Sequence, residues 1–420
     1  MRPLIVLKFG GMSLATPEQI RAAAGRVAKL RASGTNVIAV VSAMGAATDG
    51  LIKLAYSVSS QPNRRELDML LSTGERVSMS LFSMALTDAL HSSFKEAKAI
   101  SFTGSQAGLF TDETHSNARI IDIKSIRVQE ELNKGNVVIL AGFQGVSPQT
   151  KEITTLGRGG TDVTAVAMAA AFRASRCDIL KEVPGVMSAD PKLVGPTNAA
   201  RLLETLTHQQ LLDMTFWGAK VLHYRSVELA LTHQVPLRVG LAHIDDQSTD
   251  RGTSVTSEKK TESKMTNSSF ENDRTISVNS HADVRRVTFI AKSVTEALGA
   301  INSSLTSMGL PLPQILNVTQ ESNSNTTVLF TSPAESLEAQ ARALLSLGNA
   351  VQLDPTALST ITVTCQGSYT TDLTKRQSDL LGKAGIDVHA VLMSPMSLTF
   401  LVNQSQRTES VRILHSTLTF

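Results

Sequence analysis

The sequence predicts an α/β protein in which a mostly parallel sheet, covered by helices on both faces, precedes two smaller βαββαβ units. Near-continuous runs of Val, Ile and Leu at 4–9 (LIVLKF) and 36–44 (NVIAVVSAM) alternate with helical patterns. Such runs are typical of parallel strands that are buried on both faces. After residue 275, one order of strands and helices occurs twice, which predicts the two smaller units.

The elements of the first part follow in order. Segment 16–34 is expected to be a helix, because Thr16 can cap its start, Pro17 suits its first turn and Gly34 can end it. Further buried strands are expected within 134–146, 177–186 and 234–240, and a helix within 161–174. Ligands of such sheets usually bind beyond the carboxyl ends of the strands.

The second part is predicted to begin after a polar segment rich in Ser and Thr, which we interpret as a linker. The second βαββαβ unit ends without its last strand, and the strand 275–281 could supply it, so that the two units would interlock. The expected division is a first domain, a linker and two small domains, at 1–255, 256–274, 275–355 and 356–420.

Composition narrows the class of protein. The net charge of +3 and the aromatic share of 4% do not favour a nucleic-acid partner. No run approaches the ~20 apolar residues of a membrane span, and the apolar stretch at the N-terminus is too short for a signal peptide. The two cysteines, Cys177 and Cys365, are expected to be buried thiols of a cytoplasmic protein.

The first stretch that could carry chemistry is KFGG, residues 8–11. The bare backbone of Gly10 and Gly11 allows amide groups to approach an anion, and Lys8 can neutralise charge on phosphoryl oxygens. A plain strand-to-helix turn with an exposed lysine is the alternative.

The stretch TTLGRGGTDVTAVAM, residues 154–168, is more specific. A helix start next to glycine amides favours an anion, and Arg158 can grip a carboxylate with its guanidinium fork. Asp162 could instead be a partner of the helix dipole or a cap.

Four further positions could belong to a functional site, and three of them also have a purely structural interpretation. Glu75 could be a solvated glutamate, Asp190 could lie in a simple connection, and His223 could be a structural histidine. Thr48 lies in a second glycine-bearing loop that follows a strand. P-loop, GxGxxG, zinc-site and GxSxG patterns are absent from the sequence.

Taken in order, these stretches resemble the aspartokinases of the amino-acid kinase superfamily. KFGGMSLA, SAMGAATDGL, LSTGERVS, AGFQG, TTLGRGGTDVTA, VPGVMSADPKLV and GAKVLH occur in the order that the family has. The resemblance covers essentially the whole chain. It implies a three-layer αβα kinase domain followed by two ferredoxin-like ACT domains.

The resemblance also implies the reaction. ATP, with Mg²⁺ held largely by its own oxygens and water, would phosphorylate the side-chain carboxylate of aspartate, the first step toward lysine, threonine and methionine. The metal ligands of the protein stay unassigned. A homodimer or larger homo-oligomer, joined through the ACT domains, and an amino-acid effector bound there are implied as well.

The resemblance also implies a role for the residues of this chain that match the motifs of the family. Lys8 would stabilise the transferring phosphoryl group, and Asp162 would orient Lys8 or the metal-bound phosphates. Arg158 would hold the α-carboxylate of aspartate. The residues that would line the aspartate site with Arg158 are Thr48, Glu75, Phe143, Gly159, Gly160 and Thr161. The residues that would contact the nucleotide are Lys8, Gly10, Gly11, Lys181, Glu182, Val186, Asp190 and Lys220.

Some positions depart from the family pattern. Met12 stands where threonine is usual, Lys181–Glu182 where Thr–Asp is common, and Tyr224 where proline is common. The usual effector-site turns after the first strand of each ACT unit are missing in 290–300 and 364–375. Regulation by lysine, by threonine or by neither therefore stays open.

Two other functions are alternatives. The chain could be another amino-acid kinase, acting on glutamate, N-acetylglutamate or a nucleoside monophosphate. It could also be an amino-acid sensor without catalytic activity. The pair of ACT units and Arg158 favour aspartate, whereas Lys8, Glu75 and Asp162 favour catalysis.

Overall fold

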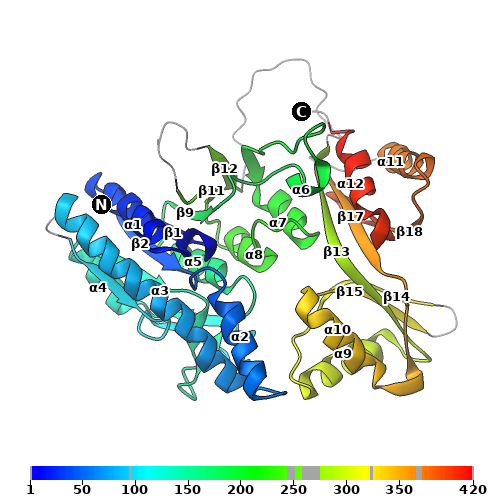
Figure 1. Ribbon diagram of the computed structural model, residues 1–420, viewed down its shortest axis with the longest axis horizontal. Coiled ribbons are helices and arrows are strands. Elements are labelled where there is room, and N and C mark those ends of the chain that lie inside the picture. Colours follow the sequence, from blue (N-terminus) through cyan, green and yellow to red (C-terminus); the bar gives the residue numbers. More distant parts are fainter. Residues whose placement is uncertain are drawn as a thin grey trace. The chain divides into compact units, whose positions relative to one another are not determined.

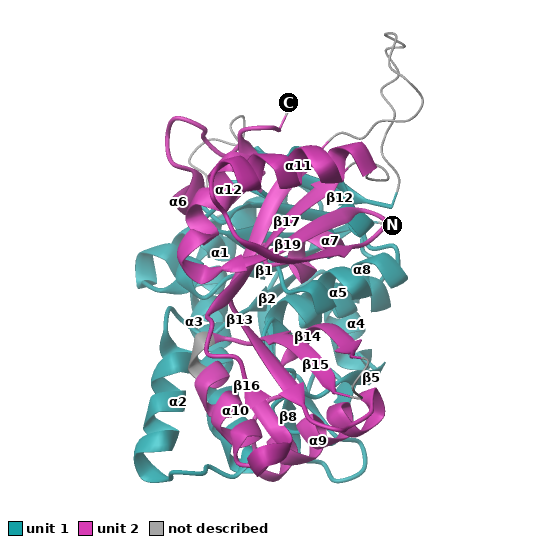
Figure 2. Cartoon of the chain, turned by 90° about the vertical axis from the view of Figure 1, so that its right-hand side faces the viewer, with its two compact units in different colours: residues 1–186, 202–212, 220–261 teal, residues 187–201, 213–219, 262–420 magenta. Residues whose placement is uncertain are grey.

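The computed structural model describes residues 2–93, 97–243, 251–257, 275–321, 325–365 and 371–418. The chain forms two compact units, which Figure 2 distinguishes by colour. The first comprises the described residues of 1–186, 202–212 and 220–261. The second comprises those of 187–201, 213–219 and 262–420. Most of the predicted linker, residues 258–274, lies outside the described residues.

An eight-stranded sheet forms the centre of the first unit, in the order β10-β12-β11-β9-β1-β2-β6-β3. All neighbours are parallel except β11 and β12. The strands span Leu4–Phe9 (β1), Asn36–Val41 (β2), Ala99–Phe102 (β3), Val137–Ala141 (β6), Arg176–Lys181 (β9), Thr205–Thr207 (β10), Leu237–Leu241 (β11) and Gly252–Thr256 (β12). The mostly parallel sheet that the Val/Ile/Leu runs predict is therefore confirmed.

Helices cover both faces of this sheet (Figure 1). On one face, Leu7 and Phe9 of β1 belong to a core shared with α1 and α3, and the Phe9 and Phe82 rings lie 5.3 Å apart. On the other face, α5 contacts β1 and β9, and α4 contacts β6. The helices are α1 (Pro17–Ala32), α2 (Ala47–Val58), α3 (Arg64–Ser93), α4 (Ile126–Asn133), α5 (Gly160–Ala171) and α8 (Tyr224–Thr232). A further helix, α7 (His208–Phe216), is divided between the units after residue 212.

Local signals in the sequence place α1 as expected. Thr16 caps the helix in a capping box with Gln19, Pro17 is its first residue, and Gly34 follows its end with a φ of 91°. In the predicted strand within 177–186, however, β9 ends at Lys181, and the chain then turns at Pro184. Proline cannot donate a ladder hydrogen bond, which ends the pairing there.

A smaller sheet of the first unit, in the order β5-β4-β7-β8, carries loops of the candidate site. Its strands are β4 (Leu109–Thr111), β5 (Ile120–Ile123), β7 (Gln144–Val146) and β8 (Ile153–Thr155). The sequence analysis did not predict this sheet, because its strands are only three or four residues long.

The second unit is built on one seven-stranded sheet, in the order β14-β15-β13-β17-β19-β18, with β16 also paired to β13. The strands are β13 (Thr275–Phe289), β14 (Gln314–Gln320), β15 (Thr326–Thr331), β16 (Val351–Leu353), β17 (Leu358–Cys365), β18 (Val388–Met393) and β19 (Ser397–Asn403). The helices are α9 (Val294–Ser307), α10 (Ala334–Leu345), α11 (Thr371–Lys383) and α12 (Arg407–His415).

Strand β13 serves both repeats. Residues 275–284 pair with β17 of the second repeat, and residues 284–289 pair with β15 and β16 of the first. The sequence analysis expected a separate strand at 275–281, whereas the structure has one 15-residue strand with a register shift between His281 and Val284. The strand 275–281 thus lies where the second repeat needs its missing strand.

Two segments of the predicted first domain belong to the second unit. Residues 187–201 include α6 (Pro191–Val194), and Ala189 and Val194 join the core beneath α11 and α12. Residues 213–219 contact the sheet: the Asp213 carboxylate accepts hydrogen bonds from Thr364 and Ser397 at 3.0 and 2.8 Å. Residues 366–370, part of the unusual effector-site segment, lie outside the described residues.

Candidate active site

Lys8 is a buried cation at the carboxyl end of β1. Because side chains alternate along a strand, Leu7 and Phe9 enter the core with α1 and α3, and Lys8 points to the opposite face. There its Nζ lies 2.6 Å from Asp162 Oδ1 of α5, and only 6% of Lys8 is exposed. The alternative of an exposed lysine is therefore wrong.

Asp162 lies between two lysines. Lys181, the last residue of β9, places its Nζ 3.9 Å from Asp162 Oδ2. Burial alone would raise the pKa of Asp162, but the charges of Lys8 and Lys181 outweigh it and lower that pKa. Burial also lowers the pKa of Lys181, although Asp162 opposes this. Two lysine side chains share the Asp162 carboxylate here, an arrangement that suits the binding of an anion.

The KFGG turn packs tightly against neighbouring loops. The Gly10 amide donates to the Leu180 carbonyl at 3.1 Å, so this predicted phosphate donor is already engaged in the structure. A Cβ on Gly11 would lie 2.7 Å from the Ala43 carbonyl oxygen, and the Gly11 carbonyl accepts from Gly45 N–H at 2.9 Å. Gly11 is thus required for close packing.

Glu182 helps to hold the segment that follows this turn. Its Oε1 accepts a 2.6 Å hydrogen bond from the hydroxyl of Ser13, which lies in the single 3₁₀ turn Met12–Leu14. His243 Nε2 lies 2.9 Å from the Ser13 carbonyl oxygen. The acidic side chain of Glu182 therefore connects the end of β9 to the KFGG turn.

The loop before α5 depends on glycine. Gly157 and Gly159 both have a φ of 73°, a conformation that side chains disfavour. A Cβ on Gly159 would lie 2.3 Å from the His223 side chain, and one on Gly160 would lie 2.9 Å from the Phe143 ring. These close contacts bring the predicted residues of the aspartate site together, and Arg158 is exposed at the tip of the loop.

Phe143 and Thr161 complete this side of the site. Phe143 has a φ of 70°, its N–H donates to Thr164 Oγ1 at 3.2 Å, and its carbonyl accepts from Leu156 N–H at 2.8 Å. A Cβ on Gly142 would lie 2.5 Å from Thr161 Cγ2. The AGFQG segment is therefore packed directly on the first turn of α5.

Glu75 is a buried carboxylate of α3, only 3% exposed. Its Oε1 accepts from Ala43 N–H at 3.0 Å, whereas Oε2 has no hydrogen-bond partner among the described residues. Burial raises the pKa of Glu75 to about 7, although the Ala43 amide and Lys8 act in the opposite direction. The alternative of a solvated glutamate is wrong. Thr48, half-buried in the first turn of α2, follows the loop that contacts Glu75.

Of the three remaining predicted nucleotide residues, two already take part in hydrogen bonds within the chain. Val186 is buried, its N–H donates to Thr253 Oγ1 at 2.8 Å, and its carbonyl accepts from Leu203 N–H. Asp190 belongs to the second unit, where its side chain caps α6 by accepting from Lys192 N–H at 3.0 Å. Lys220 is exposed in a turn of the first unit.

The segment after Lys220 supports the glycine loop. His223 caps α8 by accepting from Arg225 N–H at 3.3 Å, and burial lowers its pKa to about 4. Arg225 donates to the carbonyl oxygens of Leu156 and Ala118 at 2.7 and 2.6 Å. The structural interpretation of His223 is therefore confirmed, and Arg225 is a supporting residue that the sequence analysis did not assign.

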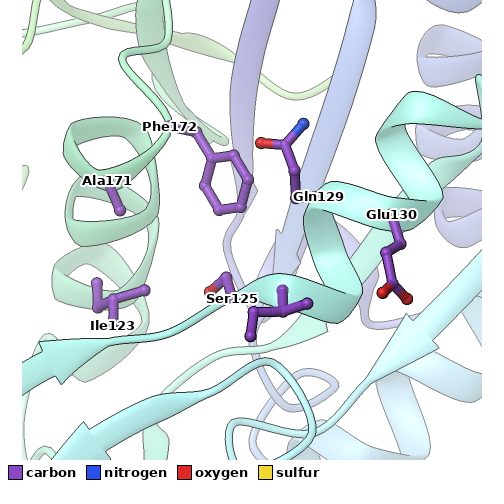
Figure 3. A pocket seen from close by; sticks show the side chains of 7 residues that line it. Ile123, Ser125, Gln129, Glu130, Ala171 and Phe172 are labelled. Carbon is purple, nitrogen blue, oxygen red and sulfur yellow. The ribbon is translucent and has the colours of Figure 1, made fainter.

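Two surface hollows lie away from these residues. One of about 350 Å³ is at the carboxyl end of α5 (Figure 3). It is lined by Ile123, Ser125, Gln129, Glu130, Ala171 and Phe172. Nine residues of α5, roughly 13 Å of helical rise, separate Ala171 from Asp162. The other, of about 430 Å³, contains Arg2, Arg31 and Lys134. Neither hollow contains a predicted site residue.

No group of three or more His, Cys, Asp or Glu side chains in the described part of the chain is arranged to hold a metal ion. Within the same residues, the helices include none with the length and apolar character needed to cross a bilayer.

Known proteins resemble the chain over its whole length. The sequence profile of the amino acid kinase family matches residues 3–240. The aspartokinase of Geobacillus stearothermophilus is 36% identical over 417 residues, 98% of this chain and 96% of that protein. Aspartokinase 2 of Bacillus subtilis (strain 168) is 47% identical over 262 residues, 62% of this chain and 61% of that protein.

A solved structure shares the fold. E. coli aspartokinase III in complex with aspartate and ADP matches with a TM-score of 0.78 and 20% identity, over 98% of this chain and 99% of that chain. At this identity the likeness shows the fold, an α/β unit with a mostly parallel sheet joined to a mostly antiparallel unit.

Proposed function

The chain belongs to the amino acid kinase family, within its aspartokinases, and on that premise we propose that it is an aspartate kinase. It transfers the terminal phosphoryl group of ATP to the side-chain carboxylate of aspartate. A carboxylate oxygen of aspartate forms the new P–O bond, and ADP leaves with the electrons of the broken one. The substrate supplies the nucleophile. The protein therefore has to position the two substrates and neutralise the charge on the phosphoryl oxygens.

The observation that carries this proposal is the buried cluster of Lys8, Asp162 and Lys181 at the strand ends. We propose that Lys8 stabilises charge on the moving phosphoryl oxygens and that Asp162 orients Lys8. The start of α5 adds its dipole, which favours an anion. Lys181 is placed to neutralise a second phosphate group of the nucleotide.

The aspartate site is proposed to lie between Arg158 and Glu75. Arg158 would grip the α-carboxylate, and the unpartnered Oε2 of Glu75 would accept from the substrate ammonium group. Thr48, Phe143, Gly159, Gly160 and Thr161 would shape the walls. Because the Gly10 amide is engaged, Gly11 is the better candidate of the two glycines for a phosphate donor.

The nucleotide is proposed to bring Mg²⁺ with it. Mg²⁺ gives up water reluctantly and is usually held by phosphate oxygens, water and one or two carboxylates. Its charge would lower the repulsion between ATP and the carboxylate of aspartate. Asp162 is the acidic side chain of the cluster, and Lys8 already holds it at 2.6 Å, which favours a role beside the metal rather than as its ligand.

Pathway, regulation and assembly are further parts of the proposal. An aspartyl 4-phosphate product would enter the synthesis of lysine, threonine and methionine. The two βαββαβ repeats would be ACT domains that bind an amino-acid effector and join copies of the chain. E. coli aspartokinase III has been solved with lysine and aspartate, at 21% identity to this chain. The buried cysteines Cys177 and Cys365 suit the reducing cytoplasm.

The test is aspartate-dependent release of ADP by the purified full chain with Mg-ATP. Trapping of the acyl phosphate by hydroxylamine should give the hydroxamate of aspartate, and lysine, threonine and both together should be added in turn. Faster turnover with glutamate would favour a different amino-acid kinase. No hydroxamate with any of these substrates would favour the amino-acid sensor.

Two variants test the assigned roles. Lys8→Ala should lower kcat by roughly 100- to 1,000-fold with a small change in the KM for aspartate, because its charge matters most as the phosphoryl group moves. Arg158→Ala should mainly raise the KM for aspartate. Similar small effects of both would contradict these roles.

A further inference from the structure

Asp68 of α3 is a completely buried carboxylate. Its hydrogen-bond partners are His115, Ser116 and Thr155, which lie in two separate segments of the chain. Its Oδ2 accepts from Ser116 N–H at 3.0 Å and from Thr155 N–H at 3.1 Å, and lies 2.8 Å from His115 Nδ1. Its Oδ1 accepts from the Thr155 hydroxyl at 2.6 Å and from the Ser116 hydroxyl at 3.3 Å. Hydrogen bonds to a charged acceptor are about twice as strong as neutral ones.

These donors belong to the two segments that enclose the glycine loop. Thr155 is the last residue of β8, three positions before Arg158. Ser116 has a φ of 66°, and its carbonyl oxygen would be 2.9 Å from a Cβ on Gly157. Ala118 N–H also donates to the Thr155 carbonyl at 2.9 Å. Asp68 therefore fixes both segments next to the turn from which Arg158 extends.

The same face of α3 holds the other loops of the site. Ser72 and Glu75 follow Asp68 at spacings of four and three residues, which places all three on one side of the helix. The Ser72 carbonyl accepts from Gln144 Nε2 at 2.9 Å, next to Phe143, and Glu75 accepts from Ala43 N–H. Helix α3 thus anchors three loops of the candidate aspartate site in turn.

We propose that Asp68 is a positioning residue for the amino-acid substrate, which acts through the loop of residues 157–160. Its carboxylate holds the base of this loop, so that the Arg158 guanidinium meets the α-carboxylate of the substrate in a fixed place. This inference rests on the proposed function, because it assigns Arg158 to aspartate.

The charge of Asp68 is required, because every group that faces it is a donor. Asparagine has the same shape, but its NH₂ group would face the N–H groups of Ser116 and Thr155 where Oδ2 now accepts. A substitution Asp68→Asn would therefore loosen the base of the loop without creating a cavity.

The kinetic experiment compares Asp68→Asn with Asp178→Asn in the full chain. Asp178 is equally deep in the same unit, in the middle of β9, and its carboxylate pairs with Arg176 at 2.7 Å. Asp68→Asn should raise the KM for aspartate by roughly 10- to 100-fold, since misplacement of a binding group by about 1 Å has effects of this size. The KM for ATP should change less than about twofold in both variants, because Arg158 does not contact ATP in this proposal.

Thr155→Val is a milder second variant in case Asp68→Asn does not fold. It removes the 2.6 Å hydroxyl contact and keeps the backbone bond to Asp68, so it should raise the KM for aspartate by a smaller factor. An unchanged KM for aspartate in Asp68→Asn and Thr155→Val, or an equal rise in Asp178→Asn, would overturn the proposal.

Hydrogen exchange of the backbone separates this inference from the proposed function, because it needs no activity. In Asp68→Asn, amides within 155–161 should exchange faster than in the wild type, and those of β1 and β2 should not change. Asp178→Asn should leave 155–161 unchanged. If the wild type lacks kinase activity, the proposed function fails, and faster exchange within 155–161 would still support the positioning of the loop. Unchanged exchange there would overturn it.

Discussion

The carboxyl edge of the eight-stranded sheet buries full charges, whereas the seven-stranded sheet of the second unit buries hydroxyl groups. Lys8, Asp162 and Glu75 are each at most 6% exposed in the first unit. In the second unit, Thr362 and Thr399 are fully buried and share a 2.8 Å hydrogen bond. In this pair each hydroxyl has a partner of equal polarity, so the pair takes no charge out of water.

The difference follows from what each region has to do. Burial of an ion costs several kcal/mol that its partner recovers only in part. Phosphoryl transfer requires strong electrostatic fields in a site that excludes water. The first unit therefore contains buried charges despite their cost in free energy. A paired hydroxyl needs only one hydrogen bond, so the second unit buries the pair between β17 and β19 at little cost.

The largest effect on stability is expected from breaking the ion pair of the first unit. Lys8→Met should lower the free energy of unfolding by about 3 kcal/mol at about pH 8. Without Lys8, the strongest of the charges that oppose burial is lost and the pKa of Asp162 rises, so the native state gains a proton more readily. The deficit should therefore shrink as the pH falls toward about 5. Urea unfolding at several pH values measures it.

The double variant Lys8→Met/Asp162→Asn is the control for this experiment. It removes the carboxylate that has lost its closer lysine partner, and it should recover at least half of the lost stability, but no activity. A double variant as unstable as the single one would mean that packing of the lysine stem, rather than its charge, stabilises the site.

Glu75→Gln should make the protein more stable but less active. The pKa of Glu75 in the folded protein is about 7, above its ordinary 4.5, so its contribution to stability is lost as the pH rises through this range. The neutral variant should exceed the wild type by about 2–3 kcal/mol at about pH 8, with the advantage vanishing near pH 4. Thermal unfolding across this range tests the sign, and a constant difference at all pH values would contradict it.

The same titration should appear in substrate binding. Below about pH 7, protonation of Glu75 removes the acceptor for the substrate ammonium group, so the KM for aspartate should rise by up to about tenfold per pH unit. The KM for ATP should stay flatter in this range. In Glu75→Gln, the KM for aspartate should be high and independent of pH, and a profile that keeps its bend would assign the titration to another group.

The smallest effect is expected in the second unit. Thr362→Val should cost about 1 kcal/mol, because it leaves the buried Thr399 hydroxyl without its partner. Thr362→Val/Thr399→Val should be close to the wild type, since both polar groups are then removed. Denaturant unfolding measures the stability of both variants. If the double variant loses more stability than the two single variants together, the hydroxyl pair stabilises the protein by more than its own hydrogen bond.

Much of this architecture was predictable from local patterns. The Val/Ile/Leu runs gave the parallel sheet, and Thr16, Pro17 and Gly34 gave the limits of α1, because strand burial and helix capping depend on near neighbours. The place of Lys8 at a strand end likewise follows from the alternation along β1.

Other features depend on distant partners and were not predictable. The engagement of the Gly10 amide by Leu180 follows from pairing across 170 positions of sequence. The strands of the smaller sheet have only three or four residues, too few for their sequence pattern to predict a strand. Asp68 could have been found from its place seven residues before Glu75, which puts both carboxylates on one face of α3, but its burial depends on loops far along the chain.

Strand β13 has a consequence for the order of synthesis. The half of β13 that completes the second repeat is made about 80 residues before β17, its partner, leaves the ribosome. A chain interrupted before residue 358 would therefore carry an unfilled strand edge, which readily pairs with other chains. Chains that end between residues 353 and 358 should aggregate, even though their first repeat has every strand it needs.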